Sequence, residues 1–141
     1  MSTRCNIEIH DTFNVLGGGE QEYLGALLYH HSDGYPGFMD KKLHKFLKAT
    51  YKYLEKAGHP YWWDSERVAA VMILLSTGDY EAPTQPALHS FDVPQFQPSL
   101  KLHDDIDYIW KVVLKLKGQY EIYYRRPSEN WTKVDLIGLE Q

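Results

Sequence analysis

Residues 40–58 read DKKLHKFLKATYKYLEKAG, and this stretch decides the fold. Its apolar positions recur every three or four residues, which places them on one stripe of an α-helix: Leu43, Phe46, Leu47, Thr50 and Leu54. Gly58 follows at the position where helices commonly end. A helix of about residues 39–57 must cover this apolar stripe, so the segments on either side determine what it packs against.

The segments before this helix have the spacing of β-strands. Residues 4–10 alternate apolar and polar side chains, as in a half-buried strand. Residues 23–31 are apolar on both faces, which indicates a more central strand. Glycines at residues 17–19 separate the two strands, and the sequence Asp-Gly-Tyr-Pro-Gly at residues 33–37 forms a turn before the helix.

The segments after the helix supply a second helix and further strands. A helix of residues 64–77 is apolar on most sides, and the carboxylate of its first residue can cap it. Residues 79–103 have no clear period and contain four prolines, which predicts a long loop. Strands are then expected at residues 106–114 and 120–126 and, with a weaker signal, at residues 131–137.

This order of elements predicts a single α+β domain that spans residues 1–141. The sheet should be antiparallel-dominated, with about five strands, and the two helices should pack on one of its faces. Because two helices cover only one face, we expect some of Tyr29, Tyr123 and Trp131 to lie outside the core. Exposed aromatic area favours association, so we expect a homo-oligomer, most simply a two-fold dimer.

The composition restricts where the protein works and what it meets. The chain has one cysteine, Cys5, so it cannot form an internal disulfide, and a reducing, cytoplasmic location is expected. No stretch approaches the roughly 20 apolar residues of a membrane-spanning helix, so no membrane partner is expected. The net charge of −4 argues against a generally basic nucleic-acid-binding protein, although a local basic patch leaves nucleic acid open.

The His-x-Asp spacing of His31 and Asp33 is the first candidate site. Together with a distant His89 or His103, it matches the spacing of the iron site in non-haem oxygenases. Those enzymes use a larger barrel fold, whereas turn chemistry accounts for Asp33 and Gly34 without a metal. We therefore expect no metal, no other cofactor and no catalytic residue, and keep a metal- or His/Asp-dependent hydrolase or oxygenase as the alternative.

Two basic features indicate an anionic partner. Lysines recur along the first helix, opposite its apolar stripe: Lys41, Lys45, Lys48, Lys52 and Lys56. Such a face in an acidic protein could attract a phosphate or an acidic partner, or could simply be solvated. Tyr123 and Arg125 share one face of the predicted hairpin, where they could clamp a base or phosphate. Ordinary cross-strand packing is the other explanation for this pair.

Three segments resemble a family of small uncharacterised proteins of bacteria and their phages. The segments are Arg-Cys-Asn-Ile at residues 4–7, Leu-Tyr-His-His-Ser-Asp-Gly-Tyr-Pro at residues 28–36, and Asp-Ile-Asp-Tyr-Ile at residues 105–109. The family shares an Arg-x-Asn-Ile start and a Tyr-x-His-x-Asp-Gly-Tyr-Pro segment, but often has an aromatic residue where Ser32 stands. The resemblance implies no activity and no catalytic residues. It implies a cytoplasmic, phage-derived context, in which small proteins often sequester a nucleotide signal or block a host protein.

These observations lead to one functional expectation. We expect a non-catalytic binding protein for a small anionic, nucleotide-like ligand or for a host macromolecule, with a structural interaction module as the third possibility. The predicted ligand-binding residues are Arg4, His31, Asp33, Tyr35 and Arg125. The two arginines would match the charge of an anion, while His31 and Asp33 would fix its polar groups.

Overall fold

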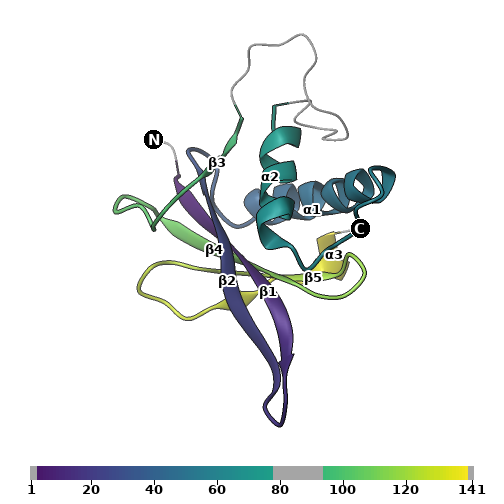
Figure 1. Cartoon of the computed structure of the whole chain (residues 1–141). Coiled ribbons are helices and arrows are strands. Elements are labelled where there is room, and N and C mark those ends of the chain that lie inside the picture. The colour runs from purple at the N-terminus through teal and green to yellow at the C-terminus, as the bar shows by residue number, and fades with distance from the viewer. Residues whose placement is uncertain (1–2, 78–93, 140–141) are drawn as a thin grey trace.

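A computed structural model describes residues 3–77 and 94–139 of the chain. It confirms an α+β fold, with one mixed, mostly antiparallel sheet (Figure 1). The strands are β1 (Cys5–Val15), β2 (Gly19–His30), β3 (Phe96–Pro98), β4 (Tyr108–Leu114), β5 (Tyr120–Arg125) and β6 (Thr132–Lys133). The helices are α1 (Met39–Lys56), α2 (Ser65–Leu75) and the single-turn α3 (Leu136–Leu139).

The sheet is a 6-stranded one with the order β3-β2-β1-β4-β5-β6. The central pair, β1 and β4, is parallel, and the other neighbours are antiparallel. The sheet has one strand more than the expected five. The unexpected strand is β3, which lies in the segment predicted to be a loop. Its three residues gain their order from pairing with the edge of β2, and so short a segment carries no periodicity of its own. Residues 79–93 of that predicted loop lie outside the described residues.

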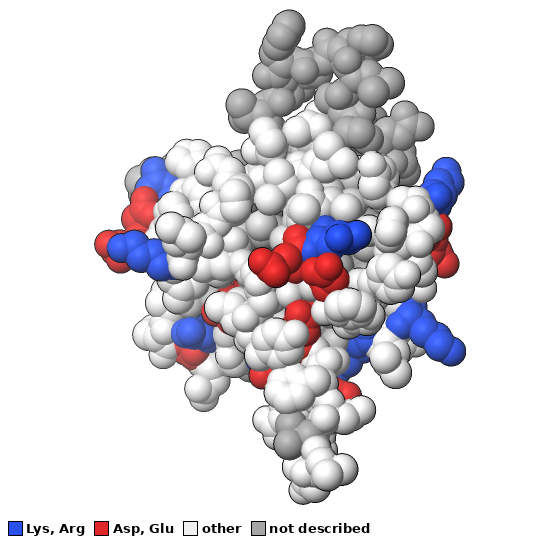
Figure 2. All heavy atoms as spheres, viewed as in Figure 1, with Lys and Arg blue, Asp and Glu red and all other residues white. Residues whose placement is uncertain are grey.

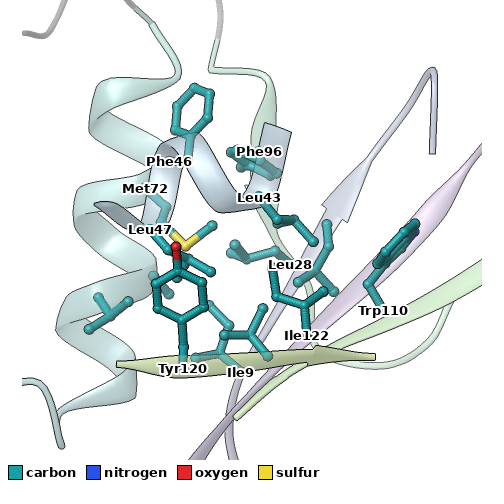
Figure 3. Packing of buried hydrophobic residues seen from close by; sticks show 14 of the residues in the cluster. Ile9, Leu28, Leu43, Phe46, Leu47, Met72, Phe96, Trp110, Tyr120 and Ile122 are labelled. Carbon is teal, nitrogen blue, oxygen red and sulfur yellow. The ribbon is translucent and has the colours of Figure 1, made fainter. Parts of the chain in front are cut away.

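The two long helices pack on one face of the sheet, as predicted. The stripe residues Leu43, Phe46 and Leu47 are buried, whereas the lysines of the predicted basic face are exposed. Figure 3 shows the core between the layers, where these side chains and Met72 of α2 meet residues of the strands. The strand residues in that view include Ile9, Leu28, Trp110, Tyr120 and Ile122.

The β1–β2 hairpin is longer than its hydrophobic pattern predicted, and it projects past the helices in Figure 1. Beyond the core, mainly exposed residues such as Asn14 and Glu20 continue the ladder. Backbone hydrogen bonds between adjacent strands hold this part, so burial does not mark its length in the sequence. The register shifts between Ile9 and His10, and Gly25 is the extra residue on the opposite strand.

The other face of the sheet is partly covered by the segment after β3. The ring of His103 stacks on Tyr29, with 4.0 Å between ring centroids. Asn6 is fully buried beneath it, accepts from the His103 backbone N–H at 2.8 Å, and donates to the Leu28 carbonyl at 2.9 Å. Tyr29 is therefore buried by this segment, whereas Tyr123 and Trp131 are half-buried.

Candidate functional site

Two of the predicted ligand-binding residues, Arg4 and His31, lie beside Tyr29. The Tyr29 hydroxyl is 3.1 Å from Nδ1 of His31. Burial raises the pKa of Tyr29, and the nearby charge of Arg4 opposes that rise. Arg4 itself forms an ion pair with Asp105, which already supplies a negative charge at this position.

Asp33 and Tyr35 belong to the turn between β2 and α1. Asp33 has a positive φ of 55°, and the carbonyl of Tyr35 accepts from the N–H of Met39 at 3.0 Å, at the start of the helix. The turn is held against the segment that precedes β1, because the N–H of Gly34 donates to the Thr3 carbonyl at 2.9 Å. A Cβ at Gly34 would lie 2.7 Å from that of Cys5. The glycine of the Asp-Gly turn therefore allows the turn to lie directly against Cys5.

Arg125 lies on the same face as Tyr29 but at the other side of the sheet. The strand order separates them by β1 and β4, so three strand spacings of about 4.8 Å put their backbones about 14 Å apart. The guanidinium of Arg125 donates to the Pro127 carbonyl at 2.7 Å and lies 4.8 Å from the Trp131 ring centroid. The predicted residues thus occupy the adjoining ends of β1 and β2, a turn and a distant strand.

A buried pair that the sequence analysis did not single out lies between α1 and β2. Lys42 is 5% exposed and His30 is 4% exposed, and Nζ of Lys42 donates to Nε2 of His30 at 2.8 Å. The other ring nitrogen of His30 donates to the Ser32 carbonyl, and Lys42 also donates to Gln95. Burial lowers the pKa of Lys42 to about 8 and that of His30 to about 4. Lys42 can therefore exchange its proton near neutral pH.

A hollow among the described residues lies between α1 and the start of β5, and we name it the α1–β5 groove. Its volume is about 800 Å³. Its lining residues come from α1, the β4–β5 turn, β5, β6 and α3: His44, Lys48, Lys115, Gly118, Gln119, Tyr120, Glu121, Lys133, Val134, Asp135, Leu136 and Ile137. The lining combines apolar side chains with three lysines and two acidic residues.

A tight turn positions this groove against α1. Lys117 and Gly118 both have positive φ values, of 56° and 80°, and a Cβ at Gly118 would meet the Tyr51 ring at 2.7 Å. The glycine therefore allows the β4–β5 turn to lie directly on an aromatic ring of α1. The groove floor is held by the hydroxyl of Tyr120, which is 2.5 Å from Nδ1 of His44.

Three lysines from separate elements converge on the groove. Lys48 comes from α1, Lys115 follows β4, and Lys133 ends β6. Glu121 lies between two of them, with its carboxylate 2.9 Å from Nζ of Lys133 and 3.7 Å from Nζ of Lys115. The hydrogen bond from Lys133 is the main reason that the pKa of Glu121 is lowered. Lys115 also forms a closer ion pair with Glu20, so the ammonium groups of Lys115 and Lys133 each have a carboxylate partner at the rim.

Only part of this groove was visible in the sequence. Lys48 belongs to the predicted basic face of α1, but Lys115, Lys133 and His44 were not among the predicted binding residues. The lysines meet because β6 pairs with β5, and β6 has only two residues. The burial of Lys42 could have been predicted more readily than the groove. Lys42 lies four residues before Phe46 and one before Leu43, on the apolar side of the helix.

Comparisons with known proteins give no relative for this chain. No protein-family model matches it, and neither a curated protein nor a solved structure shows a significant similarity. Within residues 3–77 and 94–139, no group of three or more His, Cys, Asp or Glu side chains could hold a metal ion. None of the helices described in that part of the chain is long and apolar enough to cross a membrane.

Proposed function

We propose that this chain is a non-catalytic binding protein that takes a small, nucleotide-sized anion in the α1–β5 groove. The observation that carries the proposal is the meeting of Lys48, Lys115 and Lys133 at one hollow that also has apolar lining residues. The groove lining holds these three lysines against two acidic residues, Glu121 and Asp135, whereas the chain as a whole has a net charge of −4.

The size and lining of the groove suit such a ligand. A volume of about 800 Å³ falls within the range of pockets that hold organic ligands, about 300–1,000 Å³. The side chains of Val134, Leu136 and Ile137 offer an apolar surface to a ring, while the ammonium groups face the charged part. An ammonium has three N–H donors, so the contact of Lys133 with Glu121 leaves donors for a ligand oxygen.

The exposed lysines of α1 add a longer-range effect. Lys45 and Lys52 lie one helical turn on either side of Lys48 and are exposed. Their charges would raise the local concentration of an anion without contacting it, and added salt would weaken this attraction. We therefore expect binding that decreases with ionic strength.

Calorimetric titration with pyrophosphate, AMP and ATP tests the proposal. Lys48→Gln and Lys133→Gln should each weaken binding about tenfold, as expected when a charge-assisted hydrogen bond of about 1.5 kcal/mol is lost. Lys52→Gln is the matched control, because this lysine is exposed on the same helix but does not line the groove. Absence of binding to all three probes, or equal losses in the control, would contradict the proposal.

We also propose an alternative function, a cellular setting and a dimer, all of which rest on the sequence. A His/Asp-dependent hydrolase or oxygenase is the alternative function, and one equivalent of iron or zinc that His31→Ala removes would favour it. Blocking of a host protein, a cytoplasmic and phage-derived setting, and a role as an interaction module rest on the sequence alone. The proposed dimer can be checked by light scattering at micromolar concentration, where the mass of a single chain would refute it.

A further inference from the structure

A second polar site lies where the β1–β2 hairpin meets the start of α2. Asp11 of β1 is 4% exposed, and its Oδ2 accepts from the Ser65 hydroxyl at 2.7 Å. Its other oxygen, Oδ1, is buried and has no hydrogen-bond partner among the described residues. A buried carboxylate oxygen without a donor is costly, because it has lost its hydration without replacement.

The backbone is shaped to bring these groups together. Gly25 is the extra residue of the β-bulge, and a Cβ there would lie 1.8 Å from Oγ of Ser65 and 3.0 Å from Oδ2 of Asp11. Only a residue without a side chain allows the serine hydroxyl to reach the carboxylate. Bulges of this kind are frequent beside functional sites, where they redirect side chains.

Asp11 lines a hollow of about 550 Å³, which we name the Asp11 pocket. The other lining residues are Tyr23, Leu24, Gly25, Trp63, Asp64, Ser65 and Glu66. None of them lines the α1–β5 groove, so the two sites are separate. Figure 2 shows acidic groups gathered near the middle of the face on which α2 lies, with basic groups beside them.

The pocket combines negative charge with aromatic rings. Tyr23 is the cross-strand partner of Asp11, and the pKa of Tyr23 is raised by the negative charge of Asp11 first, and then by burial and by a hydrogen bond to the Asp11 side chain. Trp63 is 68% exposed, so its ring is accessible to a ligand. Asp64 already caps α2 and pairs with Arg67 at 3.5 Å, which leaves Asp11 and Glu66 as the acidic groups that face a ligand.

We propose that the Asp11 pocket binds an organic cation with an alkylammonium or guanidinium head group. The N–H donors of such a group would pair with the Asp11 carboxylate, and the aromatic faces attract cations as well. The carboxylates repel an anion despite the nearby helix N-terminus. A metal ion prefers several converging oxygens, whereas one oxygen of Asp11 bonds Ser65 and Asp64 is engaged with Arg67.

The same head group could come from a free amine or from a Lys or Arg side chain of a partner protein. NMR titrations with spermidine, n-butylammonium and N-acetyl-arginine amide separate these sources. We expect all three cations to shift the Trp63 indole and the Ser65 amide resonances, and neutral n-butanol to leave them unchanged. Tighter binding of spermidine supports a free amine, and tighter binding of the arginine derivative supports a protein side chain.

Variants distinguish binding from a merely structural role of the Asp11–Ser65 contact. Asp11→Asn keeps the shape and an acceptor for Ser65 but removes the charge, so cation affinity should fall about tenfold or more. Trp63→Ala changes an exposed side chain and should weaken binding about 3- to 30-fold while the fold persists. Glu55→Gln, an exposed acidic residue on α1, is the charge control and should bind as the original chain does.

The proposal fails if no cation shifts the Trp63 and Ser65 resonances, or if n-butanol shifts them equally. It also fails if Asp11→Asn, in folded form, binds the cations unchanged. Should Asp11→Asn not fold, Trp63→Ala decides the matter, because unchanged affinity in that variant removes the aromatic contact on which the proposal rests. These results do not depend on the anion titrations, which report on a different hollow.

Discussion

Nζ of Lys42 lies 2.8 Å from Nε2 of His30 in the interior between α1 and β2. Both groups are basic, and burial disfavours the charged form of each. The pKa of Lys42 falls from 10.5 to about 8, so the folded chain holds fewer protons than the unfolded chain between these values. Its contribution to stability therefore increases as the pH rises through that interval.

The pH dependence of stability should show the buried state of His30. Burial lowers the pKa of His30 from 6.5 to about 4, so the unfolded chain binds more protons in that window. The free energy of unfolding should fall by up to about 3 kcal/mol from this group as the pH drops from 6.5 to 4. Urea unfolding of the original chain and of His30→Gln at several pH values measures the difference.

The His59→Gln variant, which removes an exposed histidine, is the control. If His30→Gln loses stability with the same slope as the original chain, the buried imidazole does not titrate as described.

Cys5 should be inert to thiol reagents in the folded protein. It has no exposed surface, and burial raises the pKa of its thiol to about 12, so almost no reactive thiolate forms near neutral pH. We expect iodoacetamide to label the chain only as fast as the chain opens, and labelling to accelerate in urea. In the Asn130→Cys variant, the added thiol at an exposed position should react at once. Equal rates for both thiols, measured by mass spectrometry, would contradict this prediction.

Gly25→Ala should destabilise the protein, because the new methyl group overlaps the Ser65 hydroxyl at 1.8 Å. The expected loss is about 1–3 kcal/mol, typical of overpacking in a filled site. Ser65→Gly removes the main obstacle, so the double variant should be less destabilised than the sum of the two single changes. Thermal or urea unfolding of the four chains gives this coupling directly. Additive losses would show that the two residues do not meet as described.

Asn6→Ala should release the segment that covers Tyr29. The Asn6 side chain makes two buried hydrogen bonds, to His103 and to Leu28, and their loss should cost about 2–3 kcal/mol. Hydrogen exchange of the His103 amide should accelerate, since its acceptor is removed. Asn14→Ala, at an exposed position of the same strand, should change neither quantity. Unchanged exchange at His103 in Asn6→Ala would count against this anchoring role.

Periodic patterns predicted the elements whose burial is regular. The stripe from Leu43 to Leu54 located α1, and the alternation of Cys5, Ile7 and Ile9 located the inward face of β1. Short or solvent-exposed elements left no such pattern. β3 and β6 exist through their pairing partners, and the outer hairpin is held by backbone hydrogen bonds whatever its side chains.

The sites were harder to predict because they depend on distant segments. Lys48 and Lys133 are 85 positions apart in the chain and line one groove, and Asp11 meets Ser65 only because Gly25 forms a bulge. The predicted set included Arg4 and His31, which the fold does bring to the same tyrosine. No local spacing reports contacts of this kind.

The parallel pairing of β1 with β4 has a consequence for how the chain is made. β1 is synthesised before its second neighbour, Tyr108–Leu114, which follows about 100 residues later. Until then one edge of β1 lacks its partner, and contacts of such long sequence separation slow folding. We expect nascent chains that stop before β4 to remain sensitive to protease, and chains that extend beyond β5 to become resistant. Folding of this domain should therefore wait until β4 has been made, so the β1 edge stays exposed during synthesis up to that point.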